Sequence, residues 1–287
     1  MAKGPEDFTP DLRRLKSWPS MEHSAWRQPY LADLTYGELH RLVDEYVIGH
    51  RLEILELGCG NGFLSLELAR EGHNVTGVDS DEAAVETAIR TMHSDPFMSE
   101  RGRLDYELSD FATWEPKQEF DIVVVSRVLH HILRPEKILG KVQRLLREQG
   151  RIICVEFAYD QFDLATAKWF YQMRKTLGQA GWYESEHKLS DDPDVGAHQV
   201  LREWRDQRAR ACNRFEEMRR PLYDLFREEH FSWKPHLYWE LIQHLRVPSN
   251  EVELEVARTT SAMERTLIET NGIRPVLFCF VGSKKYP

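Results

Sequence analysis

The feature that most constrains this chain is a glycine-rich turn that follows a short apolar run. Residues 53–57 read EILEL, and glycine then occupies every second position, at Gly58, Gly60 and Gly62, before a helical apolar pattern over residues 63–70. Glycine has no Cβ, so the chain can turn sharply there and bring its backbone close to a ligand. The free N–H groups at the start of the following helix attract a carboxylate or a phosphate. The segment therefore predicts a strand, a turn and a helix that together bind a cofactor.

The spacing of the glycines indicates which cofactor is bound. The dinucleotide fingerprint G-x-G-x-x-G requires glycine or alanine at position 63, where this chain has Phe63. The observed spacing is G-x-G-x-G, with Glu56 two residues before the first glycine. This pattern resembles that of class I S-adenosylmethionine-dependent methyltransferases, and the resemblance implies that Glu56 and the three glycines bind S-adenosylmethionine. The alternative is that these residues serve only a tight turn between strand and helix.

Two later strands end in acidic residues that match the same family. Asp79 ends the second predicted strand, where a carboxylate can accept hydrogen bonds from ribose hydroxyls, a role that dinucleotide folds share. Asp110 follows the third predicted strand, and the resemblance implies that it binds the adenine amino group. The resemblance also assigns Ser80 and Phe111 to the cofactor site. For Asp110 the alternative is an aspartate that only caps a helix.

The fourth predicted strand leads into a pair of histidines. Residues 120–126 are almost uninterrupted apolar and β-branched, as expected of a strand covered on both faces. The strand ends at Ser126, which the resemblance places at the cofactor, and the Leu-His-His that follows resembles the quinone-biosynthesis and other small-molecule methyltransferases. Histidine is suited to remove a proton near neutral pH, so His131, or alternatively His130, is the candidate base. Either histidine could instead begin the following helix or stack on the cofactor.

The order of the segments predicts an α/β fold. Strand and helix patterns alternate through about residue 158, with a fifth strand at residues 150–156. Residues 252–256 alternate and residues 276–281 form an apolar run, so they are predicted as the sixth and seventh strands. We therefore expect a doubly wound, mostly parallel seven-stranded sheet, the Rossmann-like fold of class I methyltransferases.

A helical insertion is expected between strands five and six. Residues 160–247 carry almost no strand signal and several helical patterns, so they are predicted to form an α-helical lid. Apolar residues from Leu201 to Leu225 recur at three- and four-residue spacing, and Arg208 occupies a missing position in that stripe. Pro221 is expected to kink or end this helix.

These patterns divide the chain into four expected parts. The first core helix is expected to start at Thr35, because Thr35 and Glu38 have the spacing of a capping box. The parts are an N-terminal segment that packs on the cofactor site (1–34), the S-adenosylmethionine-binding core (35–159), the helical lid or substrate insertion (160–247) and the last two strands (248–287).

Several large side chains outside the core are candidates for ligand contacts. Arg208 is a candidate for binding a substrate anion, and a salt bridge is the competing interpretation. Trp169 and Tyr171 are candidates for lining the substrate pocket, against which stands simple packing within the insertion. Arg27 and Tyr30 are candidates to reach the methionine end of the cofactor.

Composition restricts the classes of partner. The net charge of −9 works against nonspecific binding to a nucleic acid backbone, and no apolar stretch of about 18 or more residues is present. The first seven residues lack the apolar region of a signal peptide, so we expect a cytoplasmic protein. The four cysteines include no C-x-x-C pair, so we expect neither a disulfide framework nor a metal site. The expected partner is a small-molecule substrate, with neither nucleic acid nor membrane, and a homodimer is left open.

The sequence thus predicts an enzyme that transfers a methyl group from S-adenosylmethionine to a small molecule. Oxygen is the favoured acceptor atom, with nitrogen or carbon close behind. One alternative is an enzyme that uses the same cofactor for another reaction, such as cyclisation of its aminobutyrate arm. A second alternative is a protein that senses the cofactor, or scaffolds a partner, without turnover.

Overall fold

The central sheet has the predicted number of strands and the predicted mostly parallel arrangement. The computed structural model describes residues 28–95, 97–183 and 189–285. Within these residues seven strands form one sheet in the order β3-β2-β1-β4-β5-β7-β6. All neighbours pair in parallel except β7, which runs antiparallel to both β5 and β6. The strands are β1 (Glu53–Leu57), β2 (Asn74–Asp79), β3 (Leu104–Leu108), β4 (Phe120–Ser126), β5 (Leu146–Phe157), β6 (Phe226–Lys234) and β7 (Leu277–Lys284).

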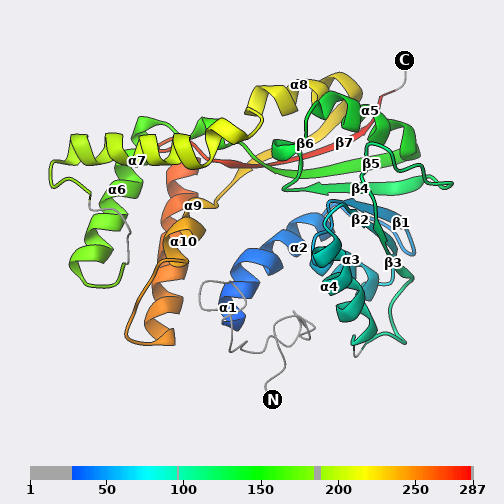
Figure 1. Cartoon of the computed structure of the whole chain (residues 1–287), viewed down its shortest axis with the longest axis horizontal. Helices are drawn as coiled ribbons and strands as arrows, with labels where there is room; N and C mark the ends of the chain where they lie inside the picture. The colour runs from blue at the N-terminus through cyan, green and yellow to red at the C-terminus, as the bar shows by residue number, and fades with distance from the viewer. Residues whose placement is uncertain (1–27, 96, 184–188, 286–287) are drawn as a thin grey trace.

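Helices cover both faces of the sheet, as the apolar fourth strand indicates. Along β4, Ile122 and Val124 face one buried apolar cluster, whereas Val123 and Val125 face another. In Figure 1, α2, α3 and α4 lie below the sheet, and α5 and α8 lie above it. The helices near the sheet are α1 (Pro29–Ala32), α2 (Glu38–Asp44), α3 (Phe63–Arg70), α4 (Glu82–His93), α5 (Pro135–Leu145) and α8 (Phe215–Leu225). Side chains that alternate along one strand therefore build two separate cores.

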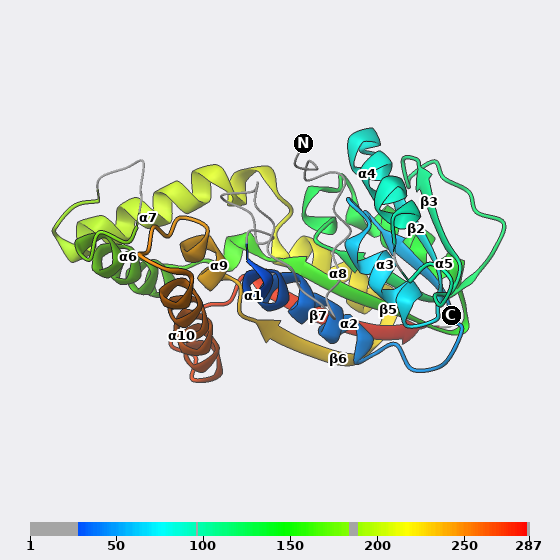
Figure 2. The same ribbon diagram turned by 90° about the horizontal axis from the view of Figure 1, so that it is seen from below.

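The remaining α-helices lie together at one end of the sheet. They are α6 (Leu164–Gln179), α7 (Pro193–Gln207), α9 (Leu237–Ile242) and α10 (Asn250–Glu269). Both views place them beyond the end at which β5 runs out and β7 begins (Figures 1 and 2). This is the carboxyl edge of the parallel strands, where ligands bind in open α/β sheets. Each helix within the described ranges is too short or too polar to cross a lipid bilayer.

The prediction of the sixth strand was wrong. Residues 252–256 lie in α10, whose N-terminus is capped by Ser249 accepting a hydrogen bond from the Val252 N–H. Val252 and Val256 are four residues apart, so a short alternating run is also compatible with one face of a helix. The sixth strand is β6, within the segment that was predicted to be helical. Its residues are largely exposed or half-buried, because it is an edge strand that pairs only with β7.

As a result, the helical material is split in two. The helices α6, α7 and α8 connect β5 to β6, and α9 and α10 connect β6 to β7. A buried carboxylate joins the second group: Glu264 of α10 accepts hydrogen bonds from the backbone N–H groups of His236, Leu237 and Tyr238 at the start of α9. The single predicted insertion is therefore two helical connections on either side of an edge strand.

Two predicted helix boundaries also differ. The capping box at Thr35 does not form, because Thr35 lies inside a helical run that starts at Pro29 and passes through a π-helical turn, η4 (Asp33–Gly37). Its hydroxyl donates a hydrogen bond to the Leu31 carbonyl oxygen one turn earlier (2.8 Å). Pro221 does not end its helix, since α8 continues to Leu225. The break falls earlier, between α7 and α8.

Candidate cofactor and active site

The glycine turn lies between β1 and α3 and adopts the conformation that its sequence predicts. Gly58, Gly60 and Gly62 have φ angles of +71°, +51° and +75°. A Cβ at Gly62 would lie 2.4 Å from the Tyr106 hydroxyl oxygen, whereas a Cβ at Gly60 would meet no atom within 4 Å. The α3 helix starts after Gly62 without a side-chain cap on its first N–H groups. The turn is thus closed on its protein side at Gly62 and open at Gly60, as a ligand cradle requires.

Side chains from β2 and β3 hold this turn. One oxygen of Asp79, Oδ2, accepts a hydrogen bond from the Gly60 N–H (2.8 Å), and Oδ1 accepts one from the Asp81 N–H (2.9 Å). The Tyr106 hydroxyl donates to the Gly62 carbonyl oxygen (2.7 Å). Ser80 is exposed beside Asp79. Asp79 therefore lies at the turn, where the sequence placed it, and has carboxylate lone pairs left for a further donor.

Glu56 lies at the end of β1, directly before the turn. Its side chain is 3% exposed and accepts a hydrogen bond from the Ser65 hydroxyl of α3. Burial raises the pKa of Glu56 to about 8, and the nearby Asp79 charge adds to that effect. A buried carboxyl beside a second carboxylate favours a positively charged ligand group. The ammonium group and the sulfonium of S-adenosylmethionine have that charge, so the residues of the turn fit this cofactor.

The other predicted cofactor residues, Asp110, Phe111 and Ser126, follow or end strands β3 and β4 and do not belong to the glycine turn. Asp110 is exposed, and its Oδ1 accepts a hydrogen bond from the Ala112 N–H (2.8 Å), so it caps the turn after β3. Phe111 is buried in the core on the α5 side, 5.8 Å from the Trp114 ring. Ser126 ends β4 opposite Val155 of β5. The structure thus keeps Asp110 at the edge of the sheet and packs the Phe111 ring inside the protein.

The histidine pair lies in a short 3₁₀ turn, η5 (Leu129–His131), after β4. His130 is 4% exposed, and its Nδ1 is 2.6 Å from Oε1 of Glu156, a residue of β5 with no exposed surface. The other oxygen of Glu156 accepts hydrogen bonds from the N–H groups of Val128 (2.6 Å) and Leu129 (2.5 Å). One buried carboxylate therefore fixes both the backbone of the turn and the His130 ring.

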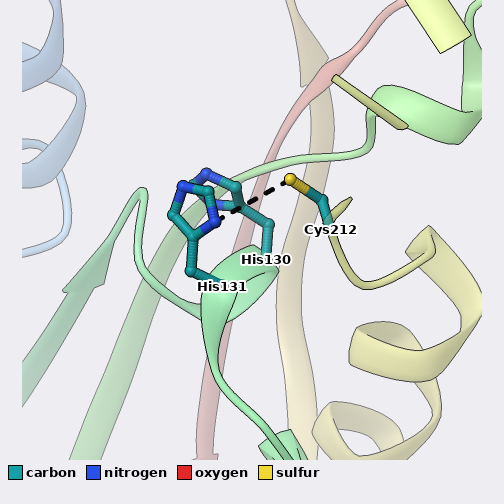
Figure 3. Close-up of side chains that lie close together, drawn as sticks. All are labelled: His130, His131 and Cys212. Carbon is teal, nitrogen blue, oxygen red and sulfur yellow. Dashed lines mark hydrogen bonds between the residues drawn. The ribbon is translucent and has the colours of Figure 1, made fainter. Parts of the chain in front are cut away.

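His131 is the exposed member of the pair. Figure 3 shows both histidine rings beside the side chain of Cys212. The two histidine ring centroids are 3.9 Å apart, and Nδ1 of His131 is 3.8 Å from the sulfur of Cys212, which precedes α8. Partial burial and the neighbouring His130 lower the pKa of His131, while Glu156 raises it. The lowered pKa keeps His131 neutral near pH 7, which is the form that accepts a proton.

The same three side chains are the group that could hold a metal ion. One ligand atom from each of His130, His131 and Cys212 lies within 4.8 Å of the others, and imidazole with thiolate suits zinc. Burial raises the pKa of the Cys212 thiol, which favours its protonated form over the metal-binding thiolate. The absence of a metal site stays a prediction.

The cofactor turn and the histidine turn touch each other. Their strands β1 and β4 are neighbours in the sheet, with Leu57 opposite Val125. A Cβ at Gly58 would lie 2.0 Å from Cγ2 of Val128, the residue that precedes the histidine turn. A group bound at the glycine turn would therefore lie close to the histidines.

The predicted substrate residues already have partners within the protein. Arg208 forms an ion pair with Glu240 (2.7 Å). Tyr171 donates a hydrogen bond to the Ser190 carbonyl oxygen (2.9 Å), and its ring packs against Gly196 of α7. Trp169 packs against the apolar cluster on the α3 side of the sheet. These positions support the competing interpretations, a salt bridge and packing between helices.

Of the two N-terminal residues predicted to contact the cofactor, only Tyr30 lies within the residues that the structure describes. The Tyr30 hydroxyl donates a hydrogen bond to Glu253 of α10 (2.7 Å), and its contact with the cofactor stays a prediction. Arg27 lies outside the described residues.

Three residues that shape the site were missed by sequence reasoning. Glu156 lies on β5 and Tyr106 on β3, and Asn213 lies in the connection between α7 and α8. The Asn213 amide donates hydrogen bonds to the carbonyl oxygens of Leu129 and Ile132 (both 2.7 Å), which ties the histidine turn to the insertion. Only Glu156 carried a signal, as an acid at the end of an otherwise apolar strand.

Comparison with known proteins identifies relatives of the central part of the chain. A family model described as a methyltransferase domain matches residues 48–207. The mitochondrial ubiquinone biosynthesis O-methyltransferase of Schizosaccharomyces pombe is 34% identical over 101 residues, covering 35% of this chain and 36% of that protein. The ubiquinone biosynthesis O-methyltransferase of Rickettsia akari is 25% identical over 156 residues, covering 50% and 59%. The chain therefore spans less than two thirds of the length of these curated relatives.

Solved structures share the fold at low sequence identity. A SAM-dependent methyltransferase from Methanosarcina mazei matches with a TM-score of 0.50 and 19% identity, covering 85% of this chain and 98% of that chain. Geranyl diphosphate C-methyltransferase from Streptomyces coelicolor A3(2) matches with a TM-score of 0.53 and 12% identity, covering 95% and 89%. These matches confirm the predicted Rossmann-like fold.

Proposed function

Because this chain belongs to the methyltransferase domain family, we propose that it transfers a methyl group from S-adenosylmethionine to an oxygen atom of a small-molecule acceptor. Membership of the family confirms the predicted enzyme class and cofactor. The contact between the glycine turn at Gly58 and the histidine turn at Val128 is the observation that carries the proposal. It brings a cofactor cradle and a candidate base to the same edge of the sheet.

In this proposal the glycine turn and its two acids hold the cofactor. The cofactor would lie against the open side of the turn at Gly60, and Asp79 would accept hydrogen bonds from the ribose hydroxyls. The Glu56 carboxyl would bind near the positively charged end of the cofactor. When bound, S-adenosylmethionine would supply an electrophilic methyl group on a sulfonium, which is already a good leaving group. Ser80 and Asp110 lie exposed at the tips of β2 and β3, where they remain candidates for the nucleoside end.

The acceptor proton is proposed to move to His131. Its Nδ1 faces the sulfur of Cys212, so Nε2 is the nitrogen left to take a proton from an acceptor hydroxyl. The positive charge that forms on the ring would be stabilised by Glu156, whose charge favours protonated His131. His130 is proposed to hold the His131 ring by stacking, while Glu156 holds His130.

The helices at the carboxyl edge are proposed to act as a lid. Two of them, α6 and α7, follow β5 directly, and α9 and α10 stand beside them in both views (Figures 1 and 2). A cover at this edge would exclude water from the reacting groups. Oxygen is preferred as the acceptor atom because the curated relatives named above are O-methyltransferases by name.

Binding and turnover assays separate this proposal from its rivals. S-adenosylhomocysteine at a hundredfold excess over its Kd should stabilise the protein by about 2.7 kcal/mol, while NAD should not. With S-adenosylmethionine and a panel of phenols and catechols, mass spectrometry should detect a product heavier by one CH₂ group. Cofactor consumption without a methylated product would indicate another reaction of the sulfonium. Binding with no consumption across acceptors would support a cofactor-sensing protein.

A further inference from the structure

A strained arginine stands at the edge of the proposed active site. Arg127 directly follows Ser126 at the end of β4, and its φ angle is +57°, in the left-handed region that favours glycine. This conformation costs about 1–2 kcal/mol for a residue with a side chain. Strain of this kind persists where the surrounding structure enforces it and clusters at functional sites. The Arg127 N–H donates to the Val155 carbonyl oxygen (2.8 Å), which helps hold the backbone there.

In the part of the chain that the structure describes, the Arg127 side chain has no carboxylate partner. Its Nε is buried without a hydrogen-bond partner, and its guanidinium lies over the Phe157 ring, 5.7 Å from the centroid. Among the described residues no carboxylate oxygen lies within 4.0 Å of a guanidinium nitrogen of Arg127. By contrast, Arg41 pairs with Asp33 (2.6 Å) and Arg265 with Glu38 (3.7 Å). A half-buried guanidinium without a partner is ready to bind an anion from outside the chain.

Arg127 lines a cavity of about 280 Å³ that has a surplus of positive charge. The cavity lies between η4 and α2 on one side and the β6–α9 connection on the other. Its charged lining consists of four cations, two carboxylates and a histidine: Arg41, Arg127, Lys234, Arg265, Glu38, Glu45 and His236. Lys234, like Arg127, forms no ion pair within 4.0 Å in the part of the chain that the structure describes. His236 lies 3.6 Å from Glu240, so it already has an acidic neighbour.

The cavity adjoins the histidine turn through one aromatic ring. Phe157 lies under Arg127, and the same ring meets His130 edge-on at 5.3 Å. The ring of His236, which also lines the cavity, has its centroid 4.6 Å from that of Phe157. A molecule whose anion rests on Arg127 would therefore lie one ring away from the histidine pair. The other lining rings, Tyr36 and Trp239, suit an apolar or aromatic body.

We propose that Arg127, assisted by Lys234, forms an anion subsite that binds a carboxylate or phosphate group of the methyl acceptor. The planar guanidinium can bind either group through two parallel hydrogen bonds. The proposal rests on the proposed function, since it assigns the bound molecule as the acceptor. It narrows the substrate class from any small molecule to an anionic one with an apolar or aromatic body.

The test uses three fluorinated probes that differ in charge. Binding of 4-fluorobenzoate, 4-fluorophenyl phosphate and neutral 4-fluorobenzamide is measured by ¹⁹F NMR titration, with and without saturating S-adenosylhomocysteine. Arg127→Gly removes the guanidinium and relieves the backbone strain, so this variant should fold at least as well as the parent protein. Arg51→Gly is the matched control, because Arg51 also has a left-handed backbone (φ +52°) but is exposed and is not among the residues that line the cavity.

At least one anionic probe should bind the parent protein about 10- to 100-fold more tightly than the benzamide, as expected for charge-assisted hydrogen bonds. Arg127→Gly should abolish that preference, Arg127→Lys should restore part of it, and Arg51→Gly should leave it unchanged. The stronger of the two anionic probes identifies the group as a carboxylate or a phosphate. Equal binding of all three probes, or an anion preference that survives in Arg127→Gly, would overturn the subsite. If the parent protein does not bind S-adenosylhomocysteine, the proposed function is contradicted. The titrations without S-adenosylhomocysteine test the anion subsite separately, so the two failures can be distinguished.

Discussion

Glu156→Gln is expected to destabilise the protein by about 1–3 kcal/mol. The carboxylate accepts four hydrogen bonds, from the N–H groups of Val128 and Leu129 at Oε2 and from Phe157 N–H and His130 Nδ1 at Oε1. An amide keeps only one oxygen, which can still accept from the Val128 and Leu129 N–H groups. If the amide nitrogen takes the place of Oε1, neutral His130 can change tautomer and accept its N–H at Nδ1, so the Phe157 N–H is the buried donor left without an acceptor. A buried donor without an acceptor costs about 1–3 kcal/mol.

Thermal and urea unfolding measure this loss directly. At about 2–4 °C per kcal/mol, the melting temperature should fall by roughly 2–12 °C. Glu255→Gln is the control, since Glu255 is exposed on α10 and the same chemical change there should stay within about 0.5 kcal/mol. Methyl transfer should also fall, by tenfold or more, because the His130 ring loses its partner. The affinity for S-adenosylhomocysteine should change little, since Asp79 and Tyr106 hold the glycine turn. A variant with parental stability and unchanged histidine ¹⁵N shifts would refute the network.

Three further predictions address the cofactor turn and the base. Gly62→Ala should lower the free energy of unfolding by about 1–3 kcal/mol and weaken S-adenosylhomocysteine binding, because the Gly62 backbone is left-handed and the new Cβ would clash with Tyr106. The control in the same thermal melts is Gly178→Ala, which lies in a helix with open space around it and should stabilise the protein by about 0.5–1 kcal/mol. The folded-state pKa of Glu56, about 8, exceeds the unfolded value of about 4.3, so the native state binds the extra proton and stability falls as pH rises from about 5 to 8. Glu56→Gln should remove that fall, and the same change of melting temperature with pH in both proteins would contradict the prediction. His131→Ala should lower turnover by about 10² or more without changing cofactor affinity, and the acidic limb of the parent pH profile should lie below pH 6.5; full activity in this variant would remove His131 as the base.

The parallel core could be predicted because its signals are local. In β4 every residue from Ile122 to Val125 is apolar, and alternate side chains fill two different cores. The glycine turn is equally local, since its left-handed angles and its close contact at Gly62 are visible as glycines in the sequence. Such segments depend little on what the rest of the chain does.

The last strands were harder because tertiary contacts decide them. The Val-Glu alternation at residues 252–256 spans only five residues, too few to separate a period of two from a helical face, and the burial of Glu264 against α9 favours the helix. The segment that does form β6, FREEHFSWK, is charged and aromatic, as an edge strand can be, and its apolar residues do not alternate cleanly. Its assignment depends on β7, which comes about 50 residues later, and no local pattern contains that pairing.

The acceptor side of the site could not be predicted for the same reason, and Arg127 shows why. An arginine after a strand reads as an ordinary surface charge, because neither its left-handed backbone nor its missing partner is encoded in neighbouring residues. Both properties arise only when Val155 accepts a hydrogen bond from its N–H, the Phe157 ring packs against its guanidinium and Glu38 pairs with Arg265. A cofactor bound by the backbone needs closely spaced glycines, and these are visible in the sequence. A substrate bound by side chains draws them from several strand ends, so its site exists only once the sheet has formed.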